Sequence, residues 1–144
     1  MEVKNWILKK HIQNIEVISE SYLPFYKEFT INKGVIVNED FSKSKTFVNW
    51  NMYPKTYDFF YDYEGCEEAI EMLLFKSQLT AKNNVTMDFG YNNPVIQMEV
   101  SYFMKNWYDF IVGAHYESTV VSDDGKAVME FTRKYHLLSN FLIK

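Results

Sequence analysis

Cysteine is nearly absent from this chain of 144 residues, in which Cys66 is the only one. A single cysteine cannot form a disulfide within the chain, and the first residues, Met1 to Trp6, lack the apolar run of a secretory signal peptide. We therefore expect a cytoplasmic protein. Long apolar runs are missing too, because stretches such as 72–75 span only a few residues, whereas a bilayer-spanning helix needs about 20. The sequence predicts no membrane span.

Motifs for catalysis and metal binding are also missing. The chain has no glycine-rich phosphate loop, no Gly-x-Ser-x-Gly elbow and no cysteine pair at metal-ligand spacing. The three histidines, His11, His115 and His136, lie far apart in the sequence, so we expect no metal site and no cofactor. Acidic neighbours of Cys66 oppose its ionisation, which favours a structural thiol. These absences argue against an enzyme.

Arginine is scarce, with Arg133 alone beside fourteen lysines, and nineteen acidic residues give a net charge of −4. This balance repels nucleic acids and anionic membranes and favours a basic or neutral partner. Lysine, asparagine, isoleucine, tyrosine and phenylalanine are plentiful while alanine and glycine are few, which is typical of A/T-rich codons and of a bacterial or phage genome. Hydrophobic residues make up 47% and aromatic residues 18% of the chain. We expect one domain over residues 1–144 with its own core.

Apolar residues before position 85 indicate both helices and strands. Spacings of three and four residues are typical of helices, and runs of β-branched and aromatic residues are typical of strands. His11 falls on the apolar side of the first helix, where we expect it to be packed and hydrogen-bonded. Acidic residues after Gly65 favour a helix start there, at the positive end of the helix dipole. The expected elements are a helix over 3–22 that ends before Pro24, strands over 29–38, 46–53 and 57–64, and a helix over 66–82.

After the second helix the apolar period changes to two, which is typical of strands with one face on a core. The pattern predicts strands over 85–89 and 96–104 and a turn at Lys105-Asn106. One long curved strand should follow over 108–120, with a bulge at Gly113. We expect an antiparallel meander from these strands.

A tight hairpin is predicted at Asp124-Gly125. With a two-residue loop, its register pairs Val120 with Met129 and Ser118 with Phe131. Residues 135–143 are compatible with either a strand or a helix. The predicted fold class is α+β, an antiparallel curved sheet with an N-terminal helix and a second central helix packed on one face.

Six acidic residues lie between Lys55 and Lys76 without a basic residue among them, and tyrosines alternate with several of them. Such a run is often only a solvated surface. It is also suited to protein binding, because carboxylates pair with a basic partner while tyrosines supply rigid contact area. The predicted partner-binding residues are Tyr57, Asp58, Tyr61, Asp62, Tyr63, Glu64, Glu67, Glu68 and Glu71.

A small, acidic, aromatic-rich and cysteine-poor α+β domain without a catalytic motif resembles the immunity proteins of bacterial polymorphic-toxin and contact-dependent growth inhibition systems. The resemblance covers the whole chain and is one of composition, so it assigns no residue by position. It implies a stoichiometric inhibitor of a cognate toxin domain, often a basic nuclease, held in the cytoplasm of the cell that makes the toxin.

Two other functions are open from the sequence. A curved sheet around a helix can enclose an aromatic-lined pocket for a small molecule or a small enzyme's substrate. Exposed aromatic residues could alternatively form a homodimer. The residues expected at such a pocket are Trp50, Tyr102, Tyr108 and Tyr116, with Asp109 and His115 as acid and base.

Overall fold

The computed structural model describes residues 5–20, 22–40, 45–60, 67–90, 94–132 and 134–142. It contains helices α1 (Trp6–Lys10), α2 (Tyr22–Asn32), α3 (Glu67–Lys76) and α4 (Val100–Gly113). Short 3-10 helices are η1 (Ile12–Asn14), η2 (Trp50–Met52) and η3 (Gln78–Ala81). The strands are β1 (Glu16–Ser19), β2 (Tyr57–Phe60), β3 (Asn84–Asp88), β4 (Val95–Glu99), β5 (Ser118–Ser122), β6 (Val128–Phe131) and β7 (His136–Ser139).

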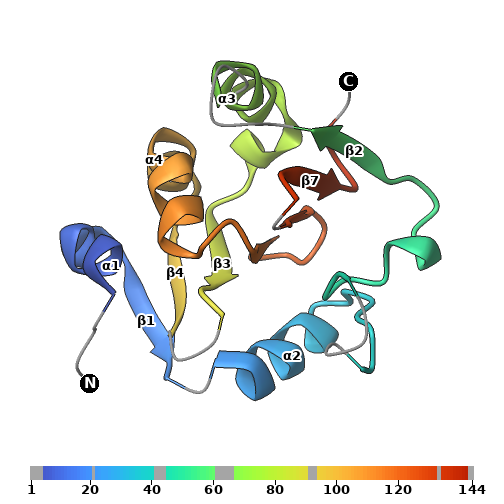
Figure 1. The fold of residues 1–144 in the computed structure, drawn as a ribbon, viewed down its shortest axis with the longest axis horizontal. Helices are drawn as coiled ribbons and strands as arrows, with labels where there is room; N and C mark the ends of the chain where they lie inside the picture. Colours follow the sequence, from blue (N-terminus) through green and yellow to red (C-terminus); the bar gives the residue numbers. More distant parts are fainter. Residues whose placement is uncertain are drawn as a thin grey trace.

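The strands form one open sheet in the order β1-β4-β3-β5-β6-β7-β2. All of its pairings are antiparallel. In Figure 1 the sheet runs from β1 on the left to β2 at the upper right, with α1, α4 and α3 on its upper side and α2 below. The predicted α+β class, with an antiparallel curved sheet and helices packed on one face, is confirmed.

Successive side chains of a strand point to opposite faces of the sheet. Both faces are covered, and each has its own core. On the face covered by α1, α3 and α4, one core gathers side chains such as Met87, Val120 and Met129. On the other face, Val121 and Val128 join a second core with Tyr26 of α2. The sequence did not predict this second layer.

The hairpin between β5 and β6 has the predicted register. Val120 pairs with Met129, and Ser118 pairs with Phe131. At the turn, Gly125 has a φ of +76°, a conformation that residues with a Cβ rarely adopt. The Asp-Gly pair therefore determined the turn and the pairing together.

The predicted helix over 3–22 is confirmed only over Trp6–Lys10 and is wrong beyond that point, in a chain whose described residues begin at residue 5. The helix ends at Lys10, and residues 16–19 pair with β4 as an edge strand. Here sheet pairing of the β-branched Val17 and Ile18 overrides a helical spacing of apolar residues. Pro24 does not end a helix but lies in the first turn of α2, where proline costs no intrahelical hydrogen bond.

The predicted strands over 29–38 and 46–53 are also wrong. Residues 29–32 complete α2, Val37 and Val48 form only an isolated bridge, and residues 50–52 form η2. This segment lies over the second face of the sheet rather than within it, so its aromatic residues pack without pairing. Of the loop predicted between the two strands, residues 41–44 lie outside the described part of the chain.

The predicted strand over 57–64 and helix over 66–82 are partly confirmed. Strand β2 covers 57–60, α3 starts at Glu67, and the helix gives way to η3 after Lys76. Residues 61–66, including Cys66, lie outside the described residues.

Helix α4 contradicts the second half of the predicted strand over 96–104, the predicted turn at Lys105-Asn106 and most of the long strand over 108–120, and it interrupts the predicted meander. Its buried side chains include Phe103, Trp107, Phe110 and Ile111, which follow the helical period. The same segment also carries the period-two alternation of residues 108, 110 and 112, which is typical of a strand. The helix is favoured because it buries the large aromatic side chains against the sheet. Residue 106 does break regularity, since its non-helical φ of −124° kinks α4.

Gly113 is not at a bulge but ends α4, against α1. A Cβ at this position would lie 2.8 Å from the Cβ of Ile7. Glycine therefore allows the two helices to approach closely.

Candidate functional site

Helix α3 exposes large apolar side chains beside acidic ones. Glu68, Met72 and Phe75 are spaced four and three residues apart, so they share one face of the helix. Met72 is 56% exposed and Phe75 46% exposed, and Glu68 is exposed too. The opposite face packs on the core through Ile70 and Leu74. Helix α3 thus packs one apolar side on the core and exposes further apolar side chains on its outer side.

Strand β2 lies at the end of the sheet, and its exposed side chains, Asp58 and Phe60, are on the face opposite to α3, because Tyr57 and Phe59 pack into the core under α3. Phe60 is 61% exposed, and its ring lies edge-on to the ring of His136 at 5.5 Å. Beside it, the Asp58 carboxylate accepts a hydrogen bond from His136 Nδ1 at 2.7 Å. We call the set Asp58, Phe60, Glu67, Glu68, Glu71, Met72 and Phe75 the β2–α3 surface, which has its α3 part on one side of this end of the sheet and its β2 part on the other.

The structure describes five of the nine predicted partner-binding residues, two on β2 and three on α3. Asp58 and Glu68 are exposed, whereas Tyr57, Glu67 and Glu71 are half-buried. The other four, Tyr61, Asp62, Tyr63 and Glu64, lie outside the described residues. Sequence reasoning missed the apolar members Phe60, Met72 and Phe75, although their positions opposite the buried side of their own elements could have identified them.

Glu67 and Glu71 face a groove between α3 and α4. The groove has a volume of about 340 Å³ and is also lined by residues 105–109. These residues include the kink of α4 at Asn106 and the aromatic rings of Trp107 and Tyr108. The acidic residues of α3 therefore divide into Glu68, which faces outward, and two that face α4.

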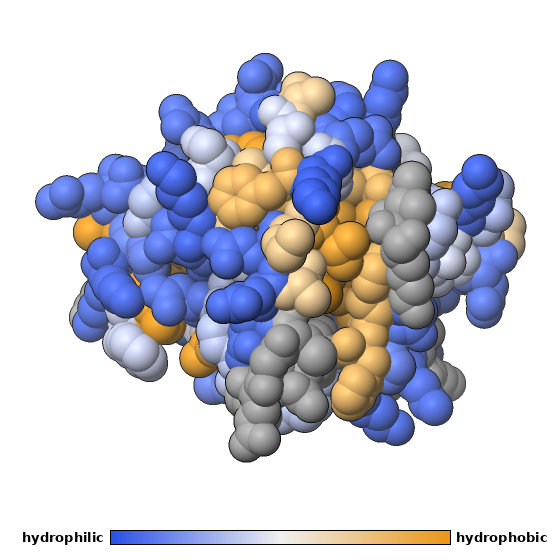
Figure 2. Space-filling model, turned by 90° about the horizontal axis from the view of Figure 1, so that it is seen from above, coloured by the Kyte–Doolittle hydropathy of each residue, from blue (hydrophilic) through white to orange (hydrophobic). Residues whose placement is uncertain are grey.

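Figure 2 views the molecule from the side on which α3 lies, and it shows an apolar area in the middle of this face with hydrophilic residues to its left and above it. Exposed apolar area bordered by charge is the usual composition of a protein-binding surface. Met72 and Phe75 contribute exposed apolar side chains on the outer face of α3.

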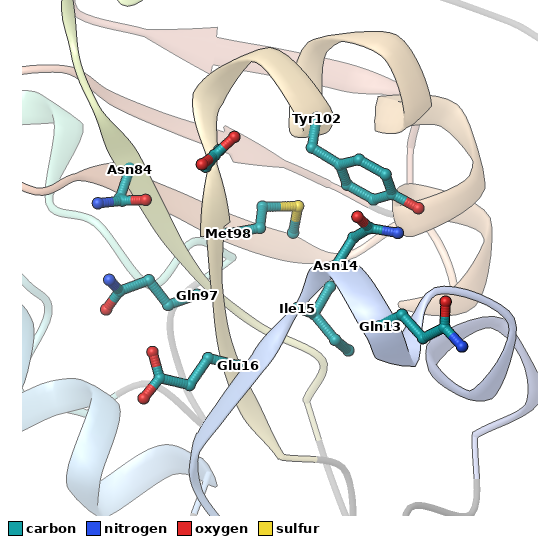
Figure 3. A pocket seen from close by; sticks show the side chains of 9 residues that line it. Gln13, Asn14, Ile15, Glu16, Asn84, Gln97, Met98 and Tyr102 are labelled. Atoms are coloured by element: carbon teal, nitrogen blue, oxygen red, sulfur yellow. The ribbon is translucent and has the colours of Figure 1, made fainter.

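A second cavity, of about 350 Å³, lies where β1, β4 and the start of α4 meet (Figure 3). Its polar side includes Glu16, Asn84 and Gln97, which point to one side of the strands in the figure. Ile15 and Met98 form an apolar part below the ring of Tyr102. The cavity is polar, open and acidic, and it differs from the aromatic-lined pocket expected from the sequence.

Tyr102 belongs to a hydrogen-bonded chain behind this cavity. Its hydroxyl donates to Nδ1 of the buried His11, and Nε2–H of His11 donates to Asp109 Oδ2 at 2.9 Å, with Lys10 Nζ 3.0 Å from the same oxygen. Partial burial raises the pKa of Asp109, but hydrogen bonds from His11 and Lys10 lower it below its usual value. This chain joins α1 to α4, and the prediction that His11 is packed and hydrogen-bonded is confirmed.

The residues expected at an aromatic pocket are not brought together. Tyr102, Tyr108 and Tyr116 pack against the core under α4, whereas Trp50 lies in the core on the other face of the sheet. The described hydrogen bonds of Asp109 go to residues 10 and 11, not to His115, which is exposed in the turn after α4.

Two buried carboxyl groups were not expected from the sequence. Glu130 accepts hydrogen bonds from the backbone N–H of Phe47 at 2.6 Å and of Val48 at 3.2 Å, and from Trp50 Nε1 at 2.9 Å. Burial raises its pKa to about 7 in spite of these donors, with the neighbouring Asp88 contributing. Burial also raises the pKa of Asp88 to about 6. The donors around Glu130 hold the segment over the second face of the sheet.

In the part of the chain that the structure describes, no three histidine, cysteine or acidic side chains are grouped to hold a metal ion. No helix within the described ranges has the length and apolarity needed to cross a membrane. Comparison with protein-family models found none that matches the chain, and a search of curated proteins found no significant match.

Proposed function

We propose that this chain is an immunity-type protein, which binds and neutralises a cognate toxin domain through the β2–α3 surface. The observation that carries the proposal is the outward face of α3, where Met72 and Phe75 are exposed next to Glu68. The compositional resemblance of the whole chain to immunity proteins supports the same function.

The chemistry of the surface favours a basic partner. The described residues of the surface carry four carboxylates, and the chain as a whole has a net charge of −4. Such a field accelerates association with a basic protein, and exposed apolar side chains slow its dissociation once they are buried. Carboxylates are also suited to occupy the positions where a nuclease binds phosphates, so a basic nuclease domain is the expected target.

The direct test is to express the C-terminal domain of the protein encoded immediately upstream in the source genome. We expect this domain to be toxic alone, to be harmless when co-expressed with this chain, and to form a one-to-one complex with it. Toxicity that persists on co-expression, or the absence of a complex between the purified proteins, would contradict the proposal.

The site is tested by two variants on α3 and by one control variant elsewhere that makes the same charge reversal. Glu68→Lys should slow association at low salt and weaken binding by about tenfold or more, because a close interfacial charge pair contributes about 1.5 kcal/mol or more. Met72→Ser should mainly accelerate dissociation. Glu28→Lys makes the same charge reversal at an exposed residue of α2, on the opposite side of the sheet from α3, and should leave binding almost unchanged.

A homodimer through the same surface is an alternative outcome of these measurements. Light scattering on the isolated chain would then show a dimer that Met72→Ser converts to a monomer. That result would assign the surface to a second copy and would overturn the proposed function.

A further inference from the structure

Strand β2 forms one end of the sheet, so only one of its edges is paired with another of the described strands. Its pairing with β7 is regular over four residue pairs, from Tyr57 with Ser139 to Phe60 with His136. An unpaired edge presents backbone N–H and C=O groups that another strand can bind.

The direction of these backbone groups follows from the hydrogen bonds on the other side of β7. Thr132 N donates to His136 O at 2.9 Å, and Asn140 N donates to Val128 O at 3.2 Å, so the even-numbered residues of β7 bond to β6. Because bonding directions alternate along an antiparallel strand, the odd-numbered residues of β7 bond to β2. Their partners there are Tyr57 and Phe59.

The backbone groups of Asp58 and Phe60 consequently point away from the sheet. No described residue beyond the paired strands makes a backbone hydrogen bond to Asp58 or Phe60. Their side chains are exposed on one face, where they contact His136. The edge therefore offers two donors, two acceptors, an exposed ring and a carboxylate in regular order.

The opposite end of the sheet differs. Strand β1 pairs with β4 irregularly, with a register shift between Val17 and Ser19. Bulges of this kind are a common protection of edge strands against further pairing. Of the two ends of the sheet, β2 is the regular one.

We infer that the partner of this protein adds an extended segment to the outer edge of β2, with a lysine or arginine next to Asp58 and an apolar side chain next to Phe60. The inference rests on the proposed function and specifies how its surface is bound. Backbone bonding gives such strand addition its affinity, and alternate side chains give it specificity. A basic segment is indicated because the exposed carboxylate of Asp58 lies on this strand, in a chain with a net charge of −4.

The first experiment measures backbone amide hydrogen exchange in the wild-type chain, alone and bound to the upstream-encoded C-terminal domain. In the free chain the amides of Asp58 and Phe60 should exchange rapidly, and in the complex about 100-fold or more slowly, as expected for newly paired strand amides. The amide of Phe59, which already faces β7, should be protected in both states. A complex in which residues 58 and 60 exchange as in the free chain would overturn the inference while leaving the proposed function intact.

The second experiment compares Asp58→Pro with Asp58→Ala. Both remove the carboxylate, but only proline removes the outward N–H, and proline is tolerated at such a position of an edge strand. Asp58→Pro should bind about tenfold or more weakly than Asp58→Ala, because a backbone donor is lost and the ring obstructs the added strand. Protection of the Phe59 amide in both variants shows that β2 has folded. Equal affinities of the two variants would overturn the inference. If the upstream-encoded domain binds neither the variants nor the wild type, the proposed function is overturned as well.

Discussion

Replacing Glu130 by glutamine should flatten the pH dependence of the folding stability. The side chain is only 4% exposed, and burial raises its pKa from 4.5 to about 7. Between these pH values the folded chain holds a proton that the unfolded chain has released, so the free energy of unfolding falls as pH rises. Asp88 acts in the same direction up to its own pKa of about 6.

The size of the effect follows from about 1.4 kcal/mol per pKa unit. Between pH 5 and pH 8, Glu130 should account for a loss of about 2.5 kcal/mol and Asp88 for about 1.4 kcal/mol. Glutamine cannot ionise, so Glu130→Gln should retain only the smaller loss. The variant also places an amide NH2 among the donors of Phe47, Val48 and Trp50, which costs about 1–3 kcal/mol at every pH and does not alter the slope.

The assay is urea unfolding of wild type and variant at pH 5, 6, 7 and 8. Glu28→Gln is the control, because Glu28 is an exposed acid on α2 and its replacement should preserve the wild-type slope. The reasoning is refuted if Glu130→Gln loses as much stability as the wild type between pH 5 and pH 8. It is equally refuted if the wild type becomes more stable over that range, since the three donors would then outweigh desolvation.

The remaining predictions concern single positions. Gly125→Ala should destabilise the chain by about 2 kcal/mol or more, because of the positive φ and because a Cβ there would collide with the Lys33 carbonyl oxygen; an unchanged thermal midpoint would contradict this. Tyr102→Phe should cost about 1–3 kcal/mol in urea unfolding, since it leaves Nδ1 of the buried His11 without its donor, and a neutral result would mean that another group replaces the hydroxyl. Met72→Ser should change stability by only about 0.5 kcal/mol, and a larger loss would show that this side chain is packed rather than exposed.

Part of the candidate site could be predicted from the sequence. The acidic run placed Asp58 and Glu68 on the surface, because charged residues between apolar ones at strand or helix spacing face solvent. The exposure of Met72 and Phe75 was missed because apolar residues are normally assigned to the core, although both lie opposite the buried side of their helix. The packing of α3 against α4 decided which apolar side chains of α3 are buried.

Local chemistry determined those elements whose signals do not compete. The Asp-Gly pair fixed the β5–β6 hairpin, because its turn geometry sets the register of both strands. Only the tertiary structure decided between helix and strand where both periods coexist, as in residues 100–120, since the free energy of burying Phe103, Trp107 and Phe110 comes from the sheet beneath them. The tertiary structure also decided the environment of Glu130. In the sequence Glu130 is an ordinary strand residue, and its burial depends on a segment some eighty residues earlier. Periodicity reports which side of an element is apolar, but the partner of that side is set by contacts that are distant in the sequence.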